Sequence, residues 1–208
     1  MDKISAEVIR TEYGHDELNI VVNGKPLGDF LYEKTGFSKT KALYPAWGSS
    51  LNCKNESKFI WELLDNQKET LNIPIFVCPE DLDLYCIVLV AKTSVTHREV
   101  CWEKIGCILK DNYDFNKEAQ SGILDVEAWS DEDVEKYCGT LAWCNVGDVE
   151  WSTWISENWN EEKMRRLHNY TYKYYQNDEN IQWYEVPRLK FLKEDYMNCL
   201  EIFRKELL

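Results

Sequence analysis

Histidines, long apolar runs and catalytic motifs are scarce in this chain. Its three histidines, His15, His97 and His168, stand in no metal-binding or triad pattern. The sequence also lacks the glycine clusters of phosphate and dinucleotide sites, the G-x-S-x-G motif of serine hydrolases and the H-E-x-x-H motif of zinc peptidases. These absences argue against the common enzyme classes. We predict no catalytic residue, no cofactor and no enzymatic activity.

No apolar run in the sequence reaches the length that a membrane span needs. The first ten residues, MDKISAEVIR, carry four charged side chains where a secretory signal needs an unbroken apolar segment. We therefore expect a cytoplasmic protein that does not associate with membranes.

The chain has eight cysteines but no C-x-x-C pair. Neighbouring cysteines such as Cys78 and Cys86, or Cys101 and Cys107, are separated by seven or five residues, which differs from the spacings of structural zinc sites. In a cytosolic protein such cysteines remain reduced. We predict free thiols, several of them in the core, and no metal site.

Positive charge is nearly missing from residues 111–162, a segment with fourteen Asp or Glu and only two Lys. Its balance of −12 accounts for almost all of the net charge of −13 of the chain. Such a segment dominates the electrostatic field of the protein and repels phosphate groups. We expect no nucleic acid partner.

A continuous apolar run at 86–91 is rich in β-branched valine and is typical of a strand buried on both faces. Residues 93–97 predict a turn and residues 98–102 a returning strand. Together they indicate a hairpin at about 86–102 in the middle of a sheet. From this pattern and the length of the chain we predict a single α+β domain, 1–208, whose mixed or antiparallel sheet is covered by three or four helices.

Further periodic segments predict the elements on both sides of this hairpin. Apolar residues at helical spacing and capping residues mark helices, whereas alternation marks strands. The polar segment 111–128 is expected to be loop-like, with a candidate short strand at 123–126. The other expected elements are a hairpin of 4–13 and 18–22, a short helix between Pro26 and Gly36, helices over 55–67, 131–138, 160–175 and 194–207, and a strand over 189–192.

The acidic segment 111–162 is also rich in tryptophan, with four between positions 143 and 159. Carboxylates steer a basic partner toward such a surface, and large rings supply desolvated anchors once the partner is bound. We assign the partner-binding surface to eight residues: Asp131, Glu132, Asp133, Glu135, Asp148, Glu150, Trp151 and Trp154.

Two structural interpretations compete with this assignment. The tryptophans from Trp129 to Trp159 can fill the core, with the acids serving solubility. Ser130, followed by three acids, can likewise be a hydroxyl N-cap with carboxylates at the positive end of a helix. Both remain open at the level of sequence.

In overall character the chain resembles the immunity proteins that bacteria encode beside polymorphic or contact-dependent toxins. Those proteins are small, cytosolic, acidic and single-domain, and they lack catalytic motifs. The resemblance covers the whole chain without a shared motif, so it carries over no individual residue. It implies a protein that binds and neutralises a cognate toxin domain, often a basic nuclease, with acidic groups that stand where phosphates would. The oligomeric state is left open.

An alternative hypothesis is a hydrolase whose carboxylate-lined pocket lies near residues 80–97. Its candidate residues are Glu80, Asp81, Asp83 and His97. The same stretch is no calcium loop of the EF-hand type, because it lacks the central glycine and the distal bidentate Glu. A solvated turn is the structural interpretation of these acids.

Overall fold

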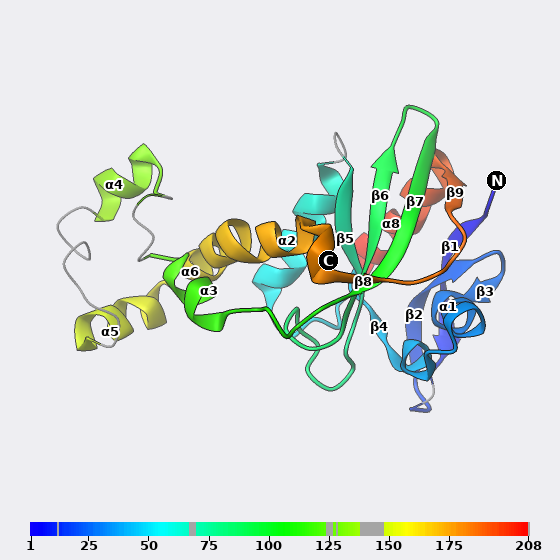
Figure 1. Ribbon diagram of the computed structural model, residues 1–208, viewed down its shortest axis with the longest axis horizontal. Coiled ribbons are helices and arrows are strands. Elements are labelled where there is room, and N and C mark those ends of the chain that lie inside the picture. Colours follow the sequence, from blue (N-terminus) through cyan, green and yellow to red (C-terminus); the bar gives the residue numbers. More distant parts are fainter. Residues whose placement is uncertain (12, 67–69, 124–126, 128, 138–147, 208) are drawn as a thin grey trace. The chain divides into compact units, whose positions relative to one another are not determined.

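The protein is described by a computed structural model that covers residues 1–11, 13–66, 70–123, 127, 129–137 and 148–207. The chain divides into two compact units. Unit 1 comprises residues 1–110 and 178–208, and unit 2 comprises residues 111–177 (Figure 1). Every strand that the structure describes belongs to unit 1, whereas the elements described in unit 2 are helical. The predicted α+β class is confirmed.

The N-terminal sheet of unit 1 consists of β1 (Ile4–Arg10), β2 (Asp16–Val22) and β3 (Lys25–Pro26), paired antiparallel in that order. The predicted N-terminal hairpin is thus confirmed. Asn23 and Gly24 connect β2 to β3 with φ of 54° and 76°. Both residues of the turn are left-handed, as in the tight turns that match the twist of antiparallel strands.

A six-stranded antiparallel sheet forms the centre of unit 1. Its strand order is β4-β5-β6-β7-β8, and β9 also pairs with β7. The predicted central hairpin is confirmed as β6 and β7, but the predicted turn at 93–97 is too long, because residues 93–95 continue β6 and pair with β7. Residues 88–91 of β6 are fully buried. The strands are β4 (Tyr44–Pro45), β5 (Leu71–Val77), β6 (Val88–Val95), β7 (Glu99–Ile108), β8 (Ile181–Trp183) and β9 (Leu189–Leu192).

The α-helices of unit 1 are α1 (Leu27–Thr35), α2 (Lys54–Asp65) and α8 (Lys193–Glu206), each close to its expected range. Gly36 ends α1 in the left-handed region, at φ 70°, and its N–H donates to the Tyr32 carbonyl at 2.8 Å. Glycine adopts this conformation at little cost, which is why it stops helices. Two 3-10 helices, η1 (Ser38–Ala42) and η4 (Asp178–Asn180), complete the unit.

Aromatic rings fill the core of unit 1. Trp102 of β7 packs edge-on against Phe191 of β9, with ring centroids 5.1 Å apart, and against Trp47 at 6.1 Å. Tyr196 and Phe203 of α8 contact Trp47 at 5.9 and 5.7 Å. All five side chains are fully buried, so this cluster joins the central sheet to the C-terminal helix.

Unit 2 consists of short helices. The helix predicted at 160–175 is confirmed as a continuous helical stretch that passes through one π-helical turn. The helix predicted from residue 131 is confirmed up to Tyr137. Residues 115–120 form a helix, so the expected loop is wrong there, and residues 124–126 of the candidate strand lie outside the described residues. The elements are α3 (Phe115–Gln120), α4 (Asp131–Tyr137), α5 (Val149–Glu157), α6 (Trp159–Arg166), η3 (Leu167–Thr171) and α7 (Tyr172–Gln176).

A buried ion pair holds part of unit 2 together. Glu162 of α6 is fully buried, and its two carboxylate oxygens accept from Arg166 Nε at 2.6 Å and from the Ile123 N–H at 2.8 Å. A Cβ at Gly122 would collide with this carboxylate. The glycine is therefore required for the close approach of the chain to Glu162.

Candidate functional site

Seven of the eight residues assigned to partner binding lie on α4 and α5, and the eighth, Asp148, immediately precedes α5. All eight belong to unit 2.

Ser130 caps α4: its Oγ accepts from the Asp133 N–H at 3.1 Å, and Asp133 Oδ2 accepts from the Ser130 N–H at 3.0 Å. This reciprocal arrangement satisfies two backbone donors at the helix start. The expected hydroxyl cap is confirmed.

Asp133 differs from the other acids of α4 because it is used inside the unit. Its Oδ1 is paired with Arg165 of α6, and both side chains are largely buried. Burial raises the pKa of this carboxyl, but the hydrogen bonds from Ser130 and the charge of Arg165 outweigh it and lower the pKa below 3.8. Asp133 thus positions α4 and is not an open contact residue.

The remaining acids of α4 face solvent. Asp131, Glu132 and Glu135 are exposed, and within the part of the chain that the structure describes they form no ion pair. Lys136, the one basic residue of α4, is paired with Glu161 of α6 at 2.8 Å. Because Glu161 balances the charge of Lys136, the three exposed acids of α4 have no nearby positive charge among the described residues of the helix. Their negative charge is therefore available to attract a basic partner.

On α5 the assigned residues fall into two groups. Asp148 and Glu150 are exposed at the N-terminal end of the helix. Trp151 and Trp154 are half-buried and pack against a small cluster formed by Ile123 and Tyr137. These two tryptophans therefore contribute to the core of unit 2 and to its surface at once.

The contact between α4 and α5 is aromatic. The rings of Tyr137 and Trp154 meet edge to face with centroids 5.1 Å apart, and Trp129 contacts Tyr137 at 5.7 Å. Helix α5 has no fully buried residue. The contact between Tyr137 and Trp154 holds α4 and α5 together, so the acids of both helices belong to one packed group of helices. The incomplete burial of α5 leaves part of its aromatic surface open to a partner.

Exposed apolar residues that are not among the eight assigned ones accompany these acids. Val149 is 78% exposed, Val134 43% and Trp159 42%. Val149 also lines a shallow hollow on α5 together with Ser152 and Thr153. Exposed apolar side chains beside carboxylates are typical of interaction surfaces. The amphipathic pattern of residues 149–157 was the signal that could have identified α5.

The four residues of the alternative hydrolase site do not come together. Glu80, Asp81 and Asp83 lie in the loop between β5 and β6, whereas His97 lies in the turn between β6 and β7. These loops are at opposite ends of the eight-residue strand β6, on the order of 26 Å apart at about 3.3 Å per residue. Asp83 Oδ1 instead accepts from the N–H groups of Tyr85 and Cys86 and shapes its own loop.

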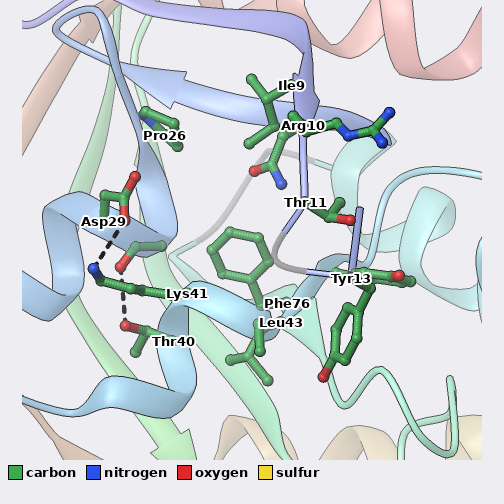
Figure 2. Close-up of a pocket in the computed structure, with 14 residues that line it drawn as sticks. Ile9, Arg10, Thr11, Tyr13, Pro26, Asp29, Thr40, Lys41, Leu43 and Phe76 are labelled. Carbon is green, nitrogen blue, oxygen red and sulfur yellow. Dashed lines mark hydrogen bonds and ion pairs between the residues drawn. The ribbon is translucent and has the colours of Figure 1, made fainter. Parts of the chain in front are cut away.

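A cavity of about 120 Å³ lies in unit 1 between the N-terminal sheet and η1 (Figure 2). Phe76 and Leu43 lie between an ion pair of Asp29 with Lys41, at 3.6 Å, and the side chain of Tyr13. Asn19, 7% exposed, also lines the cavity, and its Oδ1 lacks a hydrogen-bond partner. The cavity can hold a small polar molecule. Two hydroxyls of its lining, those of Tyr44 and Thr11, contact the ring nitrogens of His15 at 2.7 and 3.4 Å.

Comparison of the chain with protein-family models, with curated proteins and with solved structures found no match. None of the helices that the structure describes combines the length and apolar character needed to cross a membrane. Arguments about function therefore depend on the site itself.

Proposed function

We propose that this chain is an inhibitor of the immunity-protein type, which binds a basic toxin domain through the acidic and aromatic face of α4 and α5. The observation that carries the proposal is the state of the carboxylates on α4. Asp131, Glu132 and Glu135 are exposed and, among the described residues, unpaired, beside a helix whose tryptophans are only half-buried. The bacterial and cytoplasmic setting is part of this proposal.

The carboxylates and the rings act at different stages of binding. Exposed charges accelerate the encounter with a basic partner, because their field acts over about 10 Å at moderate ionic strength. Trp151 and Trp154 then supply apolar area that loses water as the partner docks. The exposed Val149 and Val134 extend that apolar area. If the toxin is a nuclease, carboxylates of α4 occupy the region of its active site that attracts phosphate.

The eight assigned residues take three roles in this proposal. Asp131, Glu132, Glu135, Asp148 and Glu150 contact the partner, and the two tryptophans anchor it. Asp133 acts indirectly, because its bond to Arg165 sets the position of α4.

The decisive experiment is a growth assay with the protein domain encoded by the gene directly upstream of this one. The domain is induced in a bacterial host with and without co-expression of this chain. We expect that induction alone stops growth and that co-expression restores it through a complex that purifies intact. A toxic domain that stays toxic while both proteins are soluble, or a domain that is not toxic, contradicts the proposal.

A further inference from the structure

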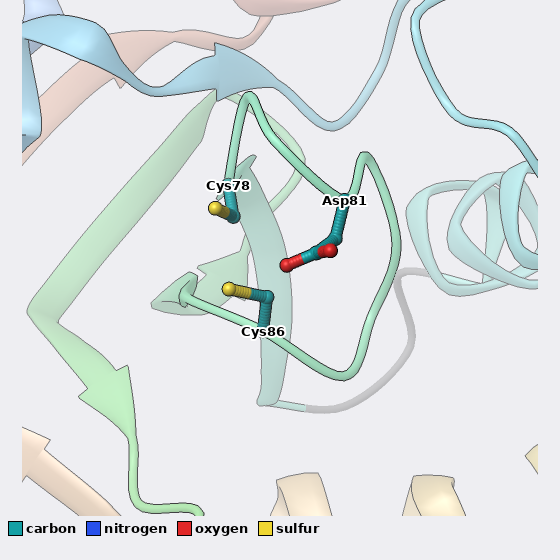
Figure 3. Close-up of side chains that lie close together, drawn as sticks. All are labelled: Cys78, Asp81 and Cys86. Carbon is teal, nitrogen blue, oxygen red and sulfur yellow. The ribbon is translucent and has the colours of Figure 1, made fainter.

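Two thiols and a carboxylate converge in the loop between β5 and β6. Cys78 follows the last residue of β5, Asp81 lies in the loop, and Cys86 lies two residues before β6. The Sγ atoms and a carboxylate oxygen all lie within 4.8 Å of one another. Figure 3 shows the three side chains pointing toward one another.

The backbone of this loop is held by bonds within the loop and from outside it. The Leu82 N–H donates to the Cys78 carbonyl at 2.9 Å, and Leu82 itself has a positive φ of 50°. Asn52 donates from its N–H to the Leu82 carbonyl at 3.0 Å and from Nδ2 to the Asp81 carbonyl at 2.9 Å. The loop is thus organised by the fold, which lowers the entropy cost of binding an ion there.

A second anchor comes from α2. Glu56, 1% exposed, accepts from the Leu84 N–H at 3.0 Å, and Leu84 is fully buried. These contacts fix the part of the loop that leads to Cys86. All the anchors belong to unit 1.

The chemistry of the three donors selects the kind of ion. Thiolates favour zinc and other thiophilic metals over magnesium and calcium, which prefer oxygen ligands. In a tetrahedral zinc site with Zn–S bonds of about 2.3 Å, two sulfur atoms are about 3.8 Å apart. The separations here, at most 4.8 Å, require only a small closure of the side chains.

We propose that Cys78, Asp81 and Cys86 bind one Zn²⁺ ion, with the fourth position open to water or to an external ligand. On binding, each thiol releases its proton to solvent and the carboxylate binds in its ionised form, so the ligated ion carries a net charge of −1. Lys110, whose Nζ donates to the Leu84 carbonyl of this loop at 2.8 Å, supplies a positive charge beside the loop. The site lies in unit 1 and does not depend on the proposed toxin binding.

The ion would tie the end of β5 to the start of β6. Because it binds the folded loop and not the unfolded chain, it stabilises unit 1 in proportion to its concentration relative to its Kd. The sequence argued against a zinc site because seven residues separate Cys78 from Cys86. The loop turns back on itself, so the two thiols lie within 4.8 Å of each other in space although seven residues separate them in the sequence.

The test is a titration of the full-length, reduced protein with Co²⁺, a coloured substitute for the spectroscopically silent Zn²⁺. We expect one equivalent of Co²⁺ to give a thiolate-to-cobalt absorption band that Zn²⁺ abolishes. Cys78→Ser/Cys86→Ser should lose this band, with affinity reduced by at least about 100-fold. Asp81→Asn, at an exposed position that leaves folding intact, should weaken binding by about tenfold or more.

The matched control is Cys53→Ser/Cys107→Ser, which removes two partly buried thiols elsewhere in the unit and should bind Co²⁺ like the natural chain. In the presence of Zn²⁺ the melting temperature should rise for the natural chain and the control but not for the Cys78→Ser/Cys86→Ser variant. No thiolate band in the reduced natural chain overturns the proposal. A band that persists without Cys78 and Cys86, or a Cys78–Cys86 disulfide as the only product, also overturns it.

Discussion

Unit 1 and unit 2 use aromatic residues and charge in opposite ways. In unit 1, rings such as Trp47 and Trp102 are fully buried, and the span holds 23 Asp or Glu against 18 Lys or Arg. In unit 2, Trp151 and Trp154 are half-buried, and 14 Asp or Glu stand against six Lys or Arg. A complete core and near-balanced charge suit a scaffold, whereas incomplete burial and one sign of charge suit a binding surface.

The difference follows from the elements that each unit contains. The sheet of unit 1 buries whole strands, and all seven residues of β5 are buried. Helices α4 and α5 have only seven and nine residues, and α5 has none fully buried. Helices of this length depend on tertiary packing for stability, so α4 and α5 are held by a few contacts such as Tyr137 with Trp154.

The largest expected effect contrasts one tryptophan of each unit. Trp102→Ala should lower the free energy of unfolding by about 3–5 kcal/mol, because it empties the centre of a fully buried aromatic cluster. Trp154→Ala should cost only about 1–2 kcal/mol, because that ring is only partly buried. Denaturant unfolding of the two variants measures the contrast. Equal losses in the free energy of unfolding would contradict the proposed difference between the two cores.

Glu162 tests whether unit 2 depends on buried charge. Glu162→Gln should cost about 2–3 kcal/mol, because it removes the nearer counter-charge of the largely buried Arg166 and leaves only Glu118, 4.0 Å away. The control, Glu161→Gln, weakens the exposed pair with Lys136 but keeps an amide oxygen that can accept from the Tyr137 hydroxyl, so it should cost at most about 1 kcal/mol. Denaturant unfolding of both variants gives the comparison. A cost for Glu161→Gln as large as that for Glu162→Gln would contradict the assignment of the buried pair.

The smallest of these effects concerns Asp133, and it depends on pH. Asp133→Asn should cost about 1–2 kcal/mol at neutral pH by weakening the cap and the pair with Arg165. Because the folded pKa lies below 3.8, this stabilisation is present above that value and is lost as the pH falls through the folded pKa. Unfolding measured at neutral pH and well below pH 3.8 should show the difference between variant and natural chain shrinking in acid. A constant difference would show that ionisation of Asp133 is irrelevant.

Local patterns in the sequence predicted much of the fold. The valine-rich run at 86–91 and the capping residues around 130 and 36 act over a few residues, and the elements they predict are present. Strand β5 was missed because Pro74 is unusual inside a strand. The structure accommodates it at an irregularity of the register, where its carbonyl accepts from Trp47 Nε1 at 2.8 Å.

Contacts between distant residues could not be predicted in this way. The use of Asp133 inside unit 2 depends on Arg165, which is 32 positions away along the chain. Likewise, the meeting of Cys78 with Cys86 depends on a loop anchored by Asn52 and Glu56 from another part of the chain. Local spacing carries no information about such contacts. The candidate site could therefore be located by charge and composition, but its internal pairing could not.

The most direct test of the contrast between the units is a matched pair of charge reversals in the growth assay with the upstream domain. Glu135→Lys/Glu150→Lys changes two exposed acids of unit 2, and Glu185→Lys/Glu201→Lys changes two exposed acids of unit 1 by the same charge. We expect the first variant to lose rescue and to bind the domain at least about tenfold more weakly, a change of about 1.4 kcal/mol, with little change in melting temperature. The second should rescue like the natural chain. Equal rescue by both variants, or loss in the unit 1 variant alone, would contradict a binding surface on α4 and α5.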